Sequence, residues 1–140
     1  MSTDISRPCT SENALPVQTL LVLLAEDNNI LARALTLQLQ KLGCEVDWVP
    51  NGAEAVSKAS EREYDLLLLD NKMPVLDGVP AAIKIKNLPN MKTTSKIVIL
   101  TGGLEREDRE RCKQAGIQLV LDKPARMQEL KQVITLVKSA

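Results

Sequence analysis

Residues 64–78 have the sequence YDLLLLDNKMPVLDG, and this stretch decides the fold. Four consecutive leucines run directly into Asp70, and a short apolar run bounded by turn residues is typical of a strand buried on both faces. Because Pro74 cannot extend such a strand, the chain must turn just after Asp70. Asp77 follows as part of a second break, and we predict that it caps the next helix. Asp70 is therefore expected at the carboxyl end of a central strand, where open α/β sheets bind ligands.

Apolar runs and amphipathic segments alternate along the rest of the chain. The expected strands are 20–25, 45–49, 66–70, 96–101 and 117–121, and the expected helices are 30–42, 51–62, 78–86, 105–115 and 126–138. Alternation of this kind predicts right-handed crossovers and one parallel sheet with five helices on both faces. The first, third and fourth strands are nearly all apolar, whereas the second alternates and the fifth contains Gln118. We therefore predict an α/β, flavodoxin-like fold with five parallel strands in the order 2-1-3-4-5.

Length and composition predict one domain, and the sequence shows neither a membrane helix nor a signal pattern. Residues 1–18 are rich in Ser, Thr and Pro without periodicity, so we expect a flexible N-terminal segment followed by a domain over 19–140. The longest apolar run, 20–25, is far shorter than the roughly 18 residues of a membrane helix. The N-terminus lacks a basic-then-apolar signal pattern. We expect a cytoplasmic domain that does not bind membranes.

Charge and residue counts exclude several functions. The chain carries 18 basic and 18 acidic residues and 1% aromatic residues. It therefore has neither the excess positive charge nor the stacking side chains that favour binding to nucleic acid. It has no histidine, which excludes histidine general bases, Ser-His-Asp triads and imidazole metal ligands. Cys9, Cys44 and Cys112 lack the spacing of a zinc site or a disulfide framework, and the last two are expected to be buried. Trp48 is expected to pack on the edge strand.

Polar residues follow four of the predicted strands: Glu26 and Asp27, Asp70, Thr101 and Lys123. The carboxyl ends of parallel strands share one edge of a sheet, so these side chains should converge. Crowded carboxylates repel unless a cation neutralises them, and an all-oxygen ligand set suits Mg²⁺. A lysine and a hydroxyl beside a carboxylate nucleophile add the parts of a phosphoryl-transfer site.

The arrangement resembles the receiver domain of two-component response regulators over about residues 20–138. The matching pieces are Glu26-Asp27, the LLLLD-x-x-MP-x-x-DG segment at 66–78, Thr101, and Lys123-Pro124. This resemblance implies a phosphorelay protein and not a conventional enzyme. Asp70 would accept a phosphoryl group from a phosphohistidine on a histidine kinase or a histidine phosphotransfer protein.

The resemblance also implies the remaining site residues. The implied Mg²⁺ ligands are the side chains of Glu26, Asp27 and Asp70 and the backbone carbonyl of Lys72. Thr101 and Lys123 would contact the phosphoryl group, and the Lys123-Pro124 bond is expected to be cis. The domain would either stand alone or form part of a larger protein such as a hybrid histidine kinase. Phosphorylation would shift a surface made by the fourth and fifth helices and the fifth strand.

The sequence departs from the family pattern at three positions. Val120 stands where the family usually has an aromatic switch residue, so the usual coupling of Thr101 to an aromatic rotamer is in question. Lys72 and Gly103 occupy positions that tune phosphate loss, and we expect Lys72 to alter the attack of water on the acyl phosphate. A pseudo-receiver that binds proteins without phosphorylation is therefore an alternative. A haloacid-dehalogenase-type phosphohydrolase would need a second acid where Lys72 stands.

Overall fold

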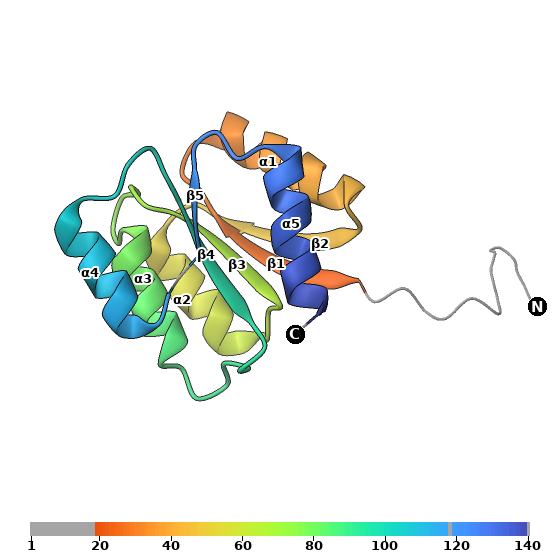
Figure 1. The fold of residues 1–140 in the computed structure, drawn as a ribbon. Coiled ribbons are helices and arrows are strands. Elements are labelled where there is room, and N and C mark those ends of the chain that lie inside the picture. The colour runs from red at the N-terminus through yellow and green to blue at the C-terminus, as the bar shows by residue number, and fades with distance from the viewer. Residues whose placement is uncertain (1–18, 118, 140) are drawn as a thin grey trace, which may run out of the picture.

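The computed structural model describes residues 19–117 and 119–139, which form a parallel sheet between two layers of helices (Figure 1). The elements are β1 (Leu20–Ala25), α1 (Asn29–Lys41), β2 (Cys44–Val49), α2 (Gly52–Glu61), β3 (Leu66–Asp70), α3 (Gly78–Lys86), β4 (Lys96–Thr101), α4 (Arg106–Ala115), β5 (Leu119–Asp122) and α5 (Met127–Lys138). The strand order is β2-β1-β3-β4-β5, and every neighbouring pair is parallel. The predicted flavodoxin-like topology is confirmed. The segment 1–18, predicted to be flexible, lies outside the described residues.

Each face of the sheet has its own hydrophobic core. Successive side chains of a strand point to opposite faces, so Val22 and Leu24 of β1 pack with α1 and α5, while Leu23 and Ala25 pack with α2, α3 and α4. Figure 1 shows α1 and α5 on one side of the sheet and the other three helices on the opposite side. Every residue of β3 is buried, as its leucine run predicts for a central strand.

The element boundaries agree with the predicted ones to within one residue, except at the start of the fifth strand, which differs by two. Ile117 was predicted to begin the fifth strand, but its N–H donates to the carbonyl of Cys112 at 2.8 Å. Gly116 adopts the left-handed conformation that ends α4, and Ile117 completes this closure with a buried side chain. β5 therefore starts only at Leu119. Gln118 lies outside the described residues.

The predicted role of Asp77 is wrong, although its position is right. Asp77 is the residue before α3 but makes no side-chain capping bond to that helix. Its Oδ1 instead accepts a hydrogen bond from the N–H of Met73 at 3.0 Å, which closes the loop after β3. Its carboxylate is therefore used by the loop and not by the helix.

Asn51 is the N-cap residue of α2. Asn51 Oδ1 accepts from the N–H of Glu54 at 2.9 Å, but the Glu54 carboxylate reaches the Asn51 side-chain amide and not its backbone. Cys44 and Cys112 are buried, one in each core, as predicted. Within 19–117 and 119–139, no helix combines the length and the hydropathy that a bilayer crossing requires.

Candidate functional site

The five predicted site residues lie at the carboxyl edge of the sheet, and the side chains of Glu26, Asp27, Asp70 and Lys123 meet there. Glu26 and Asp27 follow β1, Asp70 ends β3, Thr101 ends β4, and Lys123 follows β5. Pairing between β4 and β5 continues past the strand ends, because the N–H of Lys123 donates to the carbonyl of Thr101 at 2.9 Å. The Lys123-Pro124 bond is cis, as the resemblance implied. Parallel strand pairing thus places residues nearly a hundred positions apart around one pocket.

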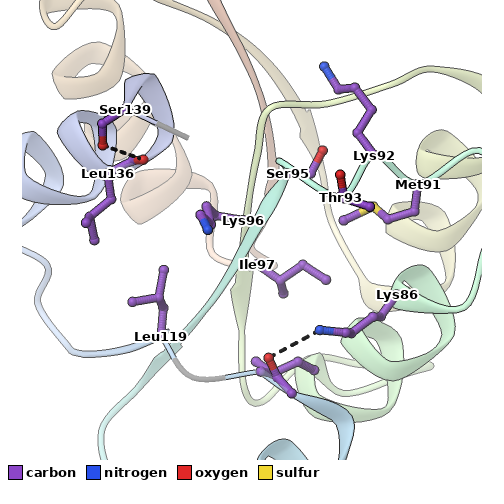
Figure 2. A pocket seen from close by; sticks show the side chains of 12 residues that line it. Lys86, Met91, Lys92, Thr93, Ser95, Lys96, Ile97, Leu119, Leu136 and Ser139 are labelled. Atoms are coloured by element: carbon purple, nitrogen blue, oxygen red, sulfur yellow. Dashed lines mark hydrogen bonds between the residues drawn. The ribbon is translucent and has the colours of Figure 1, made fainter.

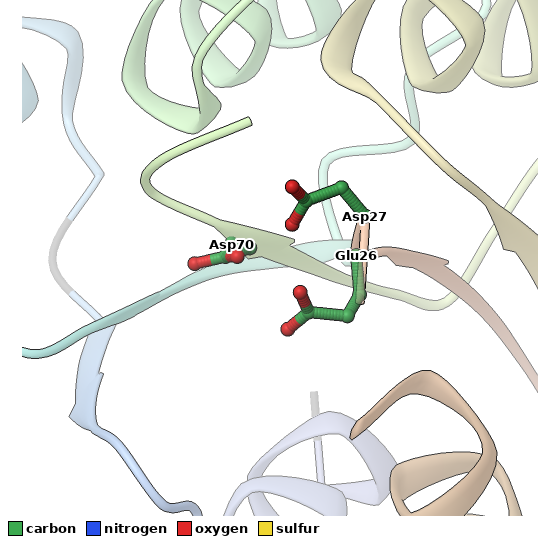
Figure 3. A group of neighbouring side chains, drawn as sticks. All are labelled: Glu26, Asp27 and Asp70. Atoms are coloured by element: carbon green, nitrogen blue, oxygen red, sulfur yellow. The ribbon is translucent and has the colours of Figure 1, made fainter. Parts of the chain in front are cut away.

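Three carboxylates form the centre of the pocket. One oxygen from each of Glu26, Asp27 and Asp70 lies within 4.8 Å of the others, and in Figure 3 the Glu26 and Asp27 side chains extend toward Asp70. Glu26 and Asp70 are only 1% and 4% exposed, whereas Asp27 lies at the solvent boundary. Two buried acids and one exposed acid in such proximity require a compensating positive charge.

Lys123 supplies part of that charge. Its Nζ lies 2.8 Å from Asp70 Oδ1 and 3.3 Å from Glu26 Oε1. Burial alone would lower the pKa of the Lys123 ammonium, but hydrogen bonding to Asp70 and the charges of both acids raise it above its usual value. The lysine therefore stays protonated and faces the acids.

Glu26 is the least compensated of the three acids. Burial raises its pKa to about 7, against the lowering effect of the Asn28 N–H bond, and the neighbouring Asp70 adds to the rise while Lys123 opposes it. Oε2 accepts from the N–H of Asn28 at 3.1 Å. Oε1 is buried without a hydrogen-bond partner among the described residues and lies 3.3 Å from the Lys123 ammonium.

This donor set fits a hard divalent cation. The ligand atoms are all carboxylate oxygens, and one of them is an orphaned buried acceptor that a cation would satisfy. The charge of a dication would also offset the repulsion that the single lysine leaves. The acidic cluster can therefore hold a metal, which agrees with the sequence expectation of Mg²⁺. The side chain of Lys72 is exposed, and metal contact through its carbonyl stays a prediction.

Thr101 is buried at the edge of the sheet, whereas Val120 is exposed. Thr101 is 3% exposed, and its Oγ1 accepts a hydrogen bond from the N–H of Gly103 at 2.9 Å, which orders the loop before α4. Val120 is 39% exposed on β5. A valine there lacks the ring that would fill or leave a space beside Thr101.

Sequence reasoning missed one residue of the site. The indole Nε1 of Trp48 donates to the backbone carbonyl of Glu26 at 2.7 Å. Trp48 was predicted only to pack on the edge strand. Its place next to the end of β2, beside β1 in the predicted strand order, was the one available signal.

A cavity elsewhere in the molecule is not this site. It has a volume of about 730 Å³ and lies at the opposite, amino edge of β4 and β5, near the ends of α3, α4 and α5 (Figure 2). Lys86, which lines it, donates to the carbonyl of Gly116 at 3.2 Å. None of the converging acids lines the cavity, and two of its three lysines make contacts, Lys86 with Gly116 and Lys92 with Asp65.

The fold and the acidic edge are those of a known class. A family model described as the response regulator receiver domain matches residues 22–135, and the chain belongs to that family. The receiver domain of a sensor histidine kinase from Pseudomonas aeruginosa is 33% identical, with a TM-score of 0.77 over 88% of this chain and all of that one. That structure was solved with a magnesium ion coordinated in its active-site cleft.

Similar curated proteins include hybrid kinases. Hybrid signal transduction histidine kinase L of Dictyostelium discoideum is 34% identical over 118 residues, covering 81% of this chain and 7% of the kinase. The autoinducer 2 sensor kinase/phosphatase LuxQ of Vibrio cholerae is 33% identical over 138 residues, covering 93% of this chain and 16% of that protein. This chain therefore spans less than a fifth of the length of these relatives.

Proposed function

We propose that this domain is the phosphoacceptor of a two-component phosphorelay. Asp70 accepts a phosphoryl group from a phosphohistidine on a histidine kinase or a histidine phosphotransfer protein. The observation that carries this proposal is the position of Lys123 Nζ, 2.8 Å from Asp70 Oδ1, beside three carboxylates that share one pocket. An aspartate that only ends a strand does not require a lysine and two further carboxylates around it.

The chemistry follows from the residues around Asp70. One Asp70 oxygen attacks phosphorus, an O–P bond forms, the P–N bond to the donor imidazole breaks, and the leaving nitrogen keeps the electron pair. The Lys123 ammonium and the Thr101 hydroxyl bind the phosphoryl oxygens, where charge is concentrated. Neither residue is consumed, and water later hydrolyses the acyl phosphate. The domain is thus a self-modifying acceptor and not a conventional enzyme.

The proposed cofactor is Mg²⁺. Its ligands would be the carboxylates of Glu26, Asp27 and Asp70 and the backbone carbonyl of Lys72. When bound, the ion would neutralise the acids and the incoming phosphoryl oxygens. Supporting this proposal are the orphaned Glu26 oxygen and the magnesium held by the related Pseudomonas receiver.

In the cell, we propose, the domain is cytoplasmic and either acts alone or is one module of a longer protein such as a hybrid histidine kinase. Phosphorylation would shift the surface formed by α4, β5 and α5. The second candidate function is a pseudo-receiver that acts as a phosphorylation-independent binding platform, and Val120 at the switch position favours it. The two candidates differ in whether Asp70 is modified.

Incubation with Mg²⁺ and acetyl phosphate separates these functions. We expect intact-mass spectrometry to show one phosphoryl group on the native chain and none on Asp70→Asn. Asp122→Asn is the matched control, because Asp122 also ends a strand but is exposed and outside the acidic cluster, so labelling should persist. Labelling of Asp70→Asn at the native level would reject the phosphoacceptor, and no labelling of the native chain would favour the pseudo-receiver.

A further inference from the structure

Trp48 contacts the site through an unusual bond between a side chain and the backbone. Its indole Nε1 donates to the carbonyl oxygen of Glu26 at 2.7 Å. Trp48 lies opposite Leu24 in the β1–β2 register, one position before the end of β2. The N–H of Glu26 donates to the carbonyl of Val49 at 3.0 Å, so β2 holds Glu26 by both its N–H and its C=O.

The Glu26 carbonyl matters because of the peptide to which it belongs. This peptide joins Glu26 to Asp27, the two neighbouring acids of the cluster, and its orientation sets the directions of both side chains. It lies past the last residue of β1, so ladder pairing within that strand does not fix its carbonyl. Among the described residues, the side-chain hydrogen bonds of this turn hold Glu26 and Asn28 but not Asp27. The direction of Asp27 therefore depends on the peptide that Trp48 holds.

We propose that Trp48 is a positioning residue for the cation site: its indole N–H fixes the Glu26-Asp27 peptide so that both carboxylates face Asp70. This inference rests on the proposed function only in assuming that the acidic cluster binds a divalent cation. A fixed peptide removes the cost of ordering these ligands when the ion binds. Loss of the N–H should therefore weaken cation affinity while leaving the fold intact.

The competing explanation is packing alone. Trp48 is 44% exposed and lines an apolar groove with Ile30 and Leu37, which are 80% and 52% exposed. If the indole only covers apolar surface, a ring without the N–H serves equally well. The test must therefore remove one hydrogen-bond donor and keep the ring.

The chain contains one tryptophan, so residue-wide replacement with benzothienylalanine, which has sulfur in place of the indole N–H, alters Trp48 alone. Trp48→Phe is the genetically simple second variant. Isothermal titration with Mg²⁺ should give an affinity roughly two- to tenfold lower for both than for the native chain, the range expected for one hydrogen bond. Leu37→Ala, which trims the same groove without touching an acid, should bind like the native chain.

A spectroscopic readout keeps the test independent of metal binding. Without Mg²⁺, the carbonyl carbon resonance of Glu26 should shift in both Trp48 variants and stay in place in Leu37→Ala. Native Mg²⁺ affinity in a folded benzothienylalanine chain would overturn the positioning role and leave the proposed function standing. Absence of Mg²⁺ binding in the native chain would overturn both.

Discussion

The charge of the Lys123 ammonium has two effects on the acidic cluster. It contacts Asp70 and Glu26 at once, so it both compensates the acids and competes with any second cation for them. Its two roles have opposite signs. It stabilises the acidic cluster without metal and, in the proposed function, the phosphoryl group after transfer, but it repels a dication at the same carboxylates.

Removing this charge should separate the two roles. We predict that Lys123→Gln binds Mg²⁺ more tightly than the native chain, because a like charge 2.8 Å from a ligand oxygen is gone. Phosphorylation by acetyl phosphate should slow by roughly a hundredfold, since a charge-stabilising donor is lost. Titration calorimetry and a labelling time course measure the two effects.

Lys113→Gln controls for net charge, because Lys113 is exposed on α4. Weaker Mg²⁺ binding in Lys123→Gln than in this control would contradict the competition between lysine and metal.

Most residues of the site could be predicted from the sequence, because the end of a buried strand is marked by an apolar run that stops at a polar residue. Glu26, Asp27, Asp70, Thr101 and Lys123 were all predicted that way, and the structure brings the three acids and Lys123 together. Trp48 was not, because a bond from its indole to the backbone of another strand leaves no local pattern in the sequence. The same holds for Asp77, whose carboxylate serves the loop rather than the helix that it precedes.

At the scale of elements, the β3–α3 loop is held by close backbone contact. Gly78 begins α3, and a Cβ built on it would lie 2.3 Å from the carbonyl oxygen of Asp70. This approach is possible only without a side chain, and it fixes the peptide that follows Asp70.

Gly78→Ala should therefore lower the free energy of unfolding by about 1–3 kcal/mol, as overpacking against fixed backbone does. Urea denaturation provides the measurement. Gly102→Ala is the matched control because a Cβ at Gly102 meets nothing within 4 Å, so its stability should stay within about 0.5 kcal/mol of native. Equal stabilities of the two variants would show that the backbone contact does not constrain this loop.

Asp65 ties three elements together at the other edge of the sheet. Its Oδ2 accepts from the N–H of Leu21 at 2.8 Å, and its Oδ1 pairs with Lys92 at 2.9 Å. Burial raises the pKa of Asp65, but the hydrogen bond from Leu21 and the contact with Lys92 lower it by more. The pKa of Asp65 therefore lies below its usual 3.8. A carboxyl with a lowered folded-state pKa stabilises the fold above the unfolded pKa, and that contribution is lost as pH falls through the folded value.

Asp65→Asn should thus cost about 1 kcal/mol of unfolding free energy at pH 7, the typical value of a hydrogen-bonded contact. The difference from the native chain should stay constant down to about pH 5 and shrink below pH 3.8. Urea titrations across this range measure it. A difference that grows on acidification would have the wrong sign for this carboxylate.

The element order was predictable for a related physical reason. Strands buried on both faces read as unbroken apolar runs, and such runs in β1, β3 and β4 place them in the middle of the sheet. The start of β5 was misplaced because Ile117 is as apolar as a strand residue. Its backbone, however, closes α4, and sequence periodicity does not distinguish these uses.

For the whole molecule, topology converts distant sequence positions into one pocket. Five parallel strands place every carboxyl end at one edge, and a hydrophobic core lies on each face of the sheet. The acidic cluster lies at this edge, and none of its residues lines the cavity at the amino edge. The proposed function therefore requires a cation and a phosphoryl group to meet at Asp70.

A crystal structure of the chain with Mg²⁺ and beryllofluoride tests this most directly. We predict a beryllium–oxygen bond to Asp70 and Mg²⁺ bound to the neighbouring carboxylates. Lys123 Nζ and Thr101 Oγ1 should lie within hydrogen-bond distance of the fluorides. An unmodified Asp70 under saturating conditions, or Mg²⁺ bound away from Glu26 and Asp27, would contradict it.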